Sequence, residues 1–308
     1  MKRFFLLCLS VAVATFGFCY ERPGFEWSVG AEAVSSYLWR GQNLGSLSLQ
    51  PDVELGYAGV KLEAWANFSA QDYTFKTFVP EMDITLSYNI AGFTVGVTHL
   101  FYFDGSKYFR LRNYGVQDYF NDNYSTSQLE IFGRFDLDYF YENLPLHIFW
   151  GTFIGGDDMY AVESDEAHGV SPTDENGNFL ELDDEGNPIY YEMKRAYSSY
   201  LEVSYDFSLP HNLTLTPIIG ITPWKSMYSY YDKNFALNNL ALKANWELEI
   251  GKHACLDFFA MVSLNTAGIN IHNWITPYDV RSDKCGYENP EKYGQRLNGC
   301  VGVGIWFY

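Results

Sequence analysis

The sequence has few basic residues and, after about the first eighteen positions, no long apolar run. It contains 20 Lys and Arg against 38 Asp and Glu, for a formal net charge of -18 and a pI of about 4.6. Because nucleic-acid phosphates bind to basic faces, this balance excludes nucleic acid as an expected partner. A spanning helix needs about 20 consecutive apolar residues, so helical membrane spans are excluded beyond the N-terminal segment.

Cysteine is also scarce, with five residues. Two of them, Cys8 and Cys19, lie in or beside the N-terminal apolar segment, and no spacing among the others is that of a metal site, so we expect no cofactor. Cys285 and Cys300 could form a disulfide worth about 3 kcal/mol by the loop-entropy argument. Free thiols are the alternative.

The N-terminal segment has the layout of a secretory signal peptide. Lys2 and Arg3 precede an apolar stretch that runs to Phe18, and no stop-transfer pattern follows. We therefore expect a signal peptide over residues 1–19, with the cleavage position open, and a single domain over residues 20–308.

Aromatic residues, by contrast, are abundant: 25 Tyr, 24 Phe and 8 Trp make up 19% of the chain. The mean hydropathy is only -0.17 although 47% of the residues are hydrophobic. Strands that alternate apolar and polar residues give this combination, and girdles at two membrane interfaces use many rings.

Alternation with a period of two is clearest in residues 297–308, where Val301, Val303, Ile305 and Phe307 share one strand face. The same pattern predicts twelve strands. The first, over residues 25–39, places Trp27, Tyr37 and Trp39 outward. Tight turns are expected at Ala58-Gly59 and Ala91-Gly92.

Short connections alternate with long loops near residues 104–125, 155–194 and 266–296, which is the asymmetry of bacterial outer-membrane barrels. The sequence therefore predicts an all-β fold, a transmembrane antiparallel up-and-down β-barrel of about 12 strands with both termini periplasmic. Outer-membrane lipids and the barrel-assembly machinery are the expected partners, and the oligomeric state is open. A soluble β-sandwich explains neither the signal nor the loop asymmetry.

The stretch Val34-Ser35-Ser36-Tyr37-Leu38-Trp39-Arg40-Gly41, followed by Leu49-Gln50-Pro51 and Gly56-Tyr57, resembles the opening signature of the TorF-like family of outer-membrane proteins. The resemblance covers roughly the first fifty residues after the signal. It implies an outer-membrane barrel of unassigned activity, and it supplies no catalytic or ligand residues to assign to positions of this sequence.

The alternation of inward and outward positions along the strands places many more carboxylates than basic groups inside the barrel. The candidate lumen-lining residues for selectivity are Asp52, Glu54, Glu63, Asp83, Glu130, Arg134, Asp136, Lys243 and Glu247. An acidic lumen favours cations and neutral polar solutes. The alternative is a ladder of salt bridges that only holds the barrel together. Inward rings, among them Trp65, Phe132, Phe149, Phe153 and Tyr200, predict a constricted pathway or none.

Arg40 faces the lumen near its outer mouth, beside the flexible Gly41. Two roles are open: anchoring the first loop against an inward carboxylate, which we favour, or contacting a solute.

The insertion over residues 155–194 carries twelve carboxylate residues and one lysine. Turn sequences separate Phe179–Leu182 from Ile189–Tyr191, so we expect a protruding hairpin. Asp174, Asn176, Asp183 and Asp184 are weak candidates for a Ca²⁺ site, and a solvated acidic loop is the favoured alternative.

An outer-membrane hydrolase would need a His beside a Ser, or an Asp-His pair, on neighbouring strands, and neither His99 nor Asp157-Asp158 with His168 meets this requirement. The leading hypothesis is a narrow channel or facilitator for small polar or cationic solutes. A closed barrel with a structural or surface-interaction role is the second.

Overall fold

The computed structural model of the protein describes residues 24–70, 80–102, 127–156, 158–171, 177, 179, 181–229, 234–266 and 297–308. The expected signal peptide, the loop 104–125 and all but the first residue of the loop 266–296 lie outside these ranges.

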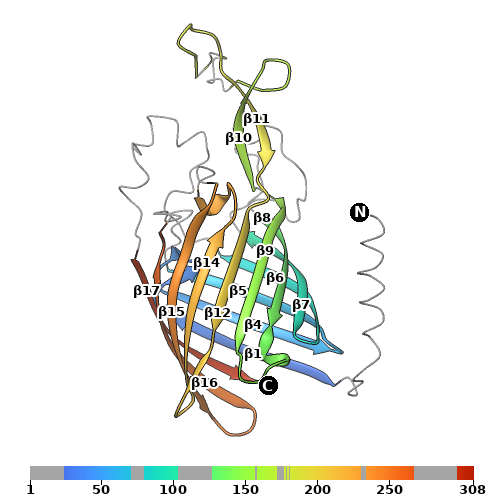
Figure 1. Ribbon diagram of the computed structural model, residues 1–308, viewed down its shortest axis with the longest axis vertical. Helices are drawn as coiled ribbons and strands as arrows, with labels where there is room; N and C mark the ends of the chain where they lie inside the picture. The colour runs from blue at the N-terminus through green and yellow to red at the C-terminus, as the bar shows by residue number, and fades with distance from the viewer. Residues whose placement is uncertain are drawn as a thin grey trace.

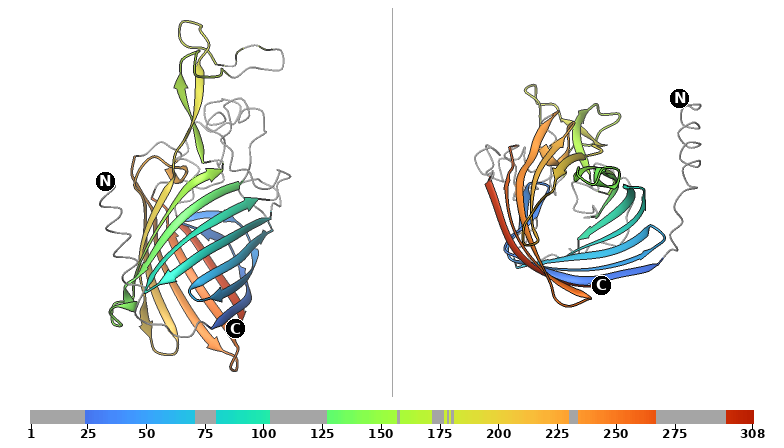
Figure 2. Two further views of the ribbon diagram at one scale, coloured as in Figure 1. Left: turned by 90° about the vertical axis from the view of Figure 1, so that its right-hand side faces the viewer. Right: turned by 60° about the horizontal axis from the view of Figure 1, so that its bottom comes forward.

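Twelve strand positions form one antiparallel sheet that closes into a barrel (Figures 1 and 2). The strands in chain order are β1 (Phe25–Val34), β4 (Ser48–Tyr57), β5 (Val60–Ser69), β6 (Glu81–Ile90), β7 (Phe93–Tyr102), β8 (Ser127–Asp136), β9 (Leu146–Gly156), β12 (Ser199–Tyr205) with its continuation β13 (Phe207–Leu209), β14 (Leu213–Thr222), β15 (Ala236–Glu249), β16 (Ala254–Leu264) and β17 (Leu297–Phe307). β12 and β13 both pair with β14 and occupy one position. β1 pairs with β17, which places Ala31 opposite Ile305 and closes the ring. The predicted fold class is confirmed.

The outer surface of the barrel is apolar along the strands. Leu62, Leu86 and Leu242 are 47%, 50% and 46% exposed, and their strand neighbours with the opposite parity face the interior. Aromatic side chains mark the end with the short turns: Phe25, Tyr57, Phe93, Trp246 and Phe307 are all exposed there. A continuous apolar belt with rings at its rim is the surface that lipid requires, so the barrel is a transmembrane one.

Two short turns at this end have the geometry that right-handed strand twist favours. Ala58 and Gly59 have φ of 53° and 81°, and Ala91 and Gly92 have φ of 52° and 74°. Positive φ at both central residues is the type I′ turn of tight hairpins. Both turns lie where the sequence predicted them.

The first predicted strand differs from the structure. β1 ends at Val34 instead of continuing to Trp39, and the chain then forms a separate hairpin from β2 (Tyr37–Trp39) and β3 (Gln42–Gly45). Tyr37 is 6% exposed and packs against Trp65, so its predicted outward position is wrong. A strand that packs on aromatic side chains inside the lumen alternates apolar and polar residues just as a lipid-facing strand does. The alternation alone therefore could not show that Tyr37 lies inside the barrel.

A second hairpin, β10 (Met159–Ser164) with β11 (Tyr190–Arg195), projects beyond the barrel at the end opposite the short turns (Figure 1). The protruding hairpin was predicted, but with strand 179–182 as the partner of 189–191. In the structure Ser164 pairs with Tyr190. The two predicted segments also meet beside their turn: Ile189 donates its backbone N–H to the carbonyl of Glu181 at 3.1 Å, and Leu182 forms an isolated bridge to Pro188.

The described residues include two 3-10 turns, η1 (Leu137–Tyr139) and η2 (Met227–Ser229). Within the same residues no helix has the length and apolar character needed to cross a membrane.

The lipid-facing assignment predicts the effect of a charge on the outer face. Leu242 lies near the middle of β15 and points outward. We expect Leu242→Arg to lower the free energy of unfolding by about 2 to 4 kcal/mol, the cost of a basic side chain at the bilayer midplane. Urea titration of the protein folded into lipid vesicles measures this, with Leu242→Ala as the control. An equal effect of both substitutions would contradict the assignment.

Candidate functional site

The hairpin of β2 and β3, called here the lumen hairpin, crosses the interior of the barrel. It leaves β1, yet Trp39 contacts Phe153 of β9, which is the strand position diametrically opposite β1 in the ring. Trp39 also packs on Tyr228 of η2, with 5.7 Å between ring centroids. Near the start of β17, the side-chain amide of Asn298 donates to the carbonyl of Gly41 at 3.2 Å. The hairpin therefore crosses the lumen at the end opposite the short turns.

Arg40 at the tip of the hairpin pairs with Glu130 of β8. Its Nη1 and Nη2 donate to Oε1 and Oε2 of Glu130 at 2.6 and 2.8 Å, and Nη1 also donates to the Tyr228 hydroxyl. The two side chains are 9% and 6% exposed. Two parallel charge-assisted bonds form the geometry in which a guanidinium holds a carboxylate most firmly. Arg40 and Glu130, chosen separately as anchor and lumen candidates, thus lie together.

Gly41 completes the turn of the lumen hairpin. Arg40 and Gly41 have φ of 49° and 81°, and Trp39 pairs with Gln42, so this is again a two-residue turn of the tight hairpin type. A Cβ on Gly41 would overlap the backbone oxygen of Asn238. Glycine is therefore required both by the backbone conformation and by the approach to β15.

Beside the lumen hairpin, the interior of the barrel contains a cavity of about 490 Å³. Aromatic and aliphatic side chains narrow it, among them Trp65, Phe132, Phe149, Phe259 and Met261, as the inward rings predicted. Arg40 and Trp39 of the hairpin line the cavity as well. A cavity of this volume is the size of a small-molecule binding site. It is smaller than the open aqueous channel of a wide porin.

One side of the cavity is acidic. Glu32, Asp52, Glu63 and Asp83 lie on the four adjacent strands β1, β4, β5 and β6 and are called here the acidic wall. Asp52 lies close to Glu63, and Glu32, Glu63 and Asp83 line the cavity directly. Within the part of the chain that the structure describes, none of the four forms a salt bridge with Lys or Arg. Lys243, whose Nζ is 4.8 Å from the Phe259 ring centroid, is the basic side chain that shares the cavity with Arg40.

The other predicted lumen residues lie nearer the end with the short turns and do not line the cavity. Lys61 donates to Glu54 at 2.8 Å, and Arg134 donates to Asp136 at 2.7 Å. Glu247 is exposed beyond them on β15. Alternation along β1 predicts that Glu32 faces the lumen, but Glu32 was not among the residues selected as selectivity candidates.

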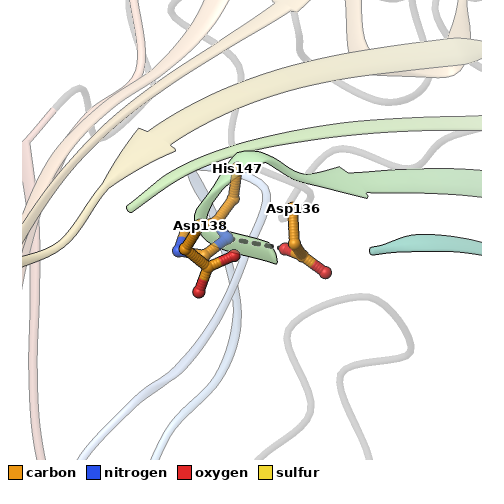
Figure 3. Close-up of side chains that lie close together, drawn as sticks. All are labelled: Asp136, Asp138 and His147. Atoms are coloured by element: carbon orange, nitrogen blue, oxygen red, sulfur yellow. Dashed lines mark hydrogen bonds and ion pairs between the residues drawn. The ribbon is translucent and has the colours of Figure 1, made fainter. Parts of the chain in front are cut away.

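A cluster at the end with the short turns places three donor atoms within 4.8 Å of one another, from Asp136, Asp138 and His147 (Figure 3). His147 Nδ1 is 2.6 Å from Asp136 and Nε2 is 3.3 Å from Asp206. One His nitrogen and two carboxylates are ligands that a divalent transition metal accepts. However, the Asp136 oxygen that faces His147 also accepts from Arg134, so groups of the protein itself already satisfy the cluster.

The weak Ca²⁺ candidates fall in the projecting insertion. Asp174 and Asn176 lie outside the described residues. The carboxylate of Asp183 accepts the backbone amides of Glu185 and Asn187 at 2.9 and 2.8 Å, and the hydrogen bonds from Asn187 lower the pKa of Asp183. Its oxygens therefore hold the turn in which Asp184 lies.

Two other predictions involve residues outside the described ranges. Cys285 lies outside them, so its pairing with the buried Cys300 stays a prediction. Asp157 is also outside, whereas Asp158 is buried and accepts from the backbone and hydroxyl of Ser198, and His168 contacts Asp165. These contacts give Asp158 and His168 separate partners.

No family model and no curated protein matches this chain, so its place in the TorF-like family stays a prediction. The chain is similar to solved bacterial barrels at low identity. The toluene transporter TodX of Pseudomonas putida is 8% identical with a TM-score of 0.35, over 96% of this chain and 91% of TodX. OprB of the same species is 10% identical with a TM-score of 0.36, over 92% of this chain and 94% of OprB. OmpF of Salmonella typhi is 9% identical with a TM-score of 0.32, over 92% and 97%. Similarities at this level do not identify a solute for this chain.

Proposed function

We propose that the chain is a facilitator of the bacterial outer membrane for small polar and cationic solutes, closed by the lumen hairpin in the conformation described here. The observation that carries the proposal is the acidic wall, which faces a cavity of about 490 Å³. Low-dielectric walls focus the field of lumen carboxylates, so that small cations concentrate beside them and anions are repelled. Lys243 offsets only part of this charge.

The proposal includes a setting for the protein. Its apolar belt would lie in outer-membrane lipids after insertion by the barrel-assembly machinery, and the motif around Arg40 and Gly41 supports membership of the TorF-like family. Passage of small solutes would then be the activity that the resemblance leaves unassigned.

Single-channel recording of the folded protein in a planar bilayer tests the proposal. We expect brief, small steps, because the hairpin closes the lumen most of the time, and a reversal potential in a KCl gradient that indicates preference for K⁺. Glu63→Gln combined with Asp83→Asn should reduce the permeability ratio of K⁺ to Cl⁻ severalfold, since it removes two carboxylates from the cavity.

Glu192→Gln is the matched control, because this carboxylate lies on the projecting hairpin outside the membrane and pairs with Lys194 at 2.6 Å. It should leave the permeability ratio unchanged. A folded barrel that stays silent, even when substitutions at Gly41 prevent the lumen hairpin from docking, would overturn the proposal. Such silence would favour the closed barrel with a surface role, for which the projecting hairpin β10–β11 is the specific observation.

A further inference from the structure

The guanidinium of Arg40 sits among rings as well as on a carboxylate. Its Cζ lies 4.5 Å from the ring centroid of Trp39, 5.0 Å from Tyr200, 5.2 Å from Phe149 and 5.7 Å from Tyr228. Aromatic faces attract cations, and a planar guanidinium both stacks on rings and binds a carboxylate with two parallel hydrogen bonds. These contacts together are those by which a protein recognises an organic cation of this type.

Most of this environment does not belong to the hairpin. Glu130, Phe149 and Tyr200 stand on the barrel strands β8, β9 and β12, and Tyr228 belongs to η2; these four residues are called here the guanidinium pocket. The pocket has its own support. Tyr200 donates to Glu202 at 2.5 Å, and Asn238 donates to the carbonyl of Tyr228 at 2.9 Å. The pocket would therefore keep its shape if Arg40 left it.

The docked hairpin also contains groups that favour its release. Gln42 is 0% exposed, and its side-chain oxygen and nitrogen have no hydrogen-bond partner among the described residues. Arg40 itself holds a left-handed backbone conformation, with φ of 49°. A buried side-chain amide without a hydrogen bond destabilises the docked state. A residue other than glycine in the left-handed backbone conformation destabilises it as well. The contacts of the Arg40 guanidinium offset these costs.

We propose that the guanidinium pocket is a binding site for an organic cation bearing a guanidinium group, and that Arg40 is its built-in competitor. A cation that takes the place of Arg40 on Glu130 removes the main attachment of the lumen hairpin. The hairpin then leaves the lumen, and the solute that displaced it lies beside the acidic wall. This inference rests on the proposed facilitator and names a class of solute for it.

Calorimetric titration of the full-length folded barrel with L-arginine tests the site. L-citrulline is the matched control, because it has nearly the same shape with a neutral ureido group. We expect wild type to bind L-arginine weakly, and Arg40→Ala to bind it at least tenfold more tightly because the internal competitor is gone. The double variant Arg40→Ala with Glu130→Gln should lose this gain. Lys194→Ala, which breaks an ion pair outside the membrane, should behave as wild type.

Equal affinity of Arg40→Ala and wild type for L-arginine would overturn the site, as would equal binding of L-citrulline. If Arg40→Ala does not fold, Arg40→Lys serves instead: it keeps a cation but loses the two parallel bonds, so L-arginine should still bind more tightly than to wild type.

The two proposals fail separately. A barrel that binds L-arginine in the titration but conducts nothing would overturn the facilitator alone. A cation-selective barrel whose Arg40→Ala variant gains no affinity would overturn the guanidinium pocket alone.

Discussion

Glu130→Gln should shift the closed barrel strongly toward the open one. The substitution leaves the guanidinium of Arg40 buried at 9% exposure without its counter-charge. Removing one partner of a buried ion pair costs about 3 to 5 kcal/mol, because the remaining charge stays desolvated and unpaired. If the lumen hairpin escapes this cost by leaving the lumen, the ratio of open to closed barrels rises by about a hundredfold or more. Single-channel recording would show this as a large increase in open time.

A double variant separates the charge from the space that the pair fills. Arg40→Met with Glu130→Met removes both charges while keeping long apolar side chains among Trp39, Phe149 and Tyr200. Buried ion pairs are often replaced by apolar residues without loss of stability, so the double variant should stay closed more than Glu130→Gln does. Open times that are equal in wild type and Glu130→Gln would show that the ion pair does not hold the hairpin.

The barrel wall could be predicted because lipid and lumen impose opposite chemistry on successive residues of each strand. That alternation identified the strands and the turns at Ala58-Gly59 and Ala91-Gly92. The same argument failed at Tyr37 and Trp39. An inward hairpin that packs on Phe153 and Tyr228 alternates as a lipid-facing strand does, because this lumen is itself lined with rings.

The candidate site could be predicted only in part. The alternation along a strand predicts which side chains face the lumen. It does not predict how far along the barrel axis a side chain lies or which side chain it contacts. Arg40 and Glu130 are 90 residues apart, and only the path of the hairpin across the lumen brings them together. Glu63 and Asp83 reach the cavity, whereas Arg134 and Asp136, which also have inward parity, lie near the end with the short turns. The register of neighbouring strands decides this, and alternation does not encode it.

Gly41→Ala should undock the lumen hairpin through the backbone rather than through charge. At φ of 81° an alanine is strained by about 1 to 2 kcal/mol, and its Cβ would also overlap the Asn238 oxygen, which a strand backbone cannot easily yield. Gly251→Ala is the matched control: its φ is 79°, but nothing lies within 4 Å of the Cβ position. The control should cost only the strain and leave the channel closed. Gly41→Ala should instead lengthen the open times as Glu130→Gln does, because both variants release the same hairpin. If the two glycine variants gave the same conductance and the same urea midpoint, the contact between the hairpin tip and β15 could not be what holds the lumen shut.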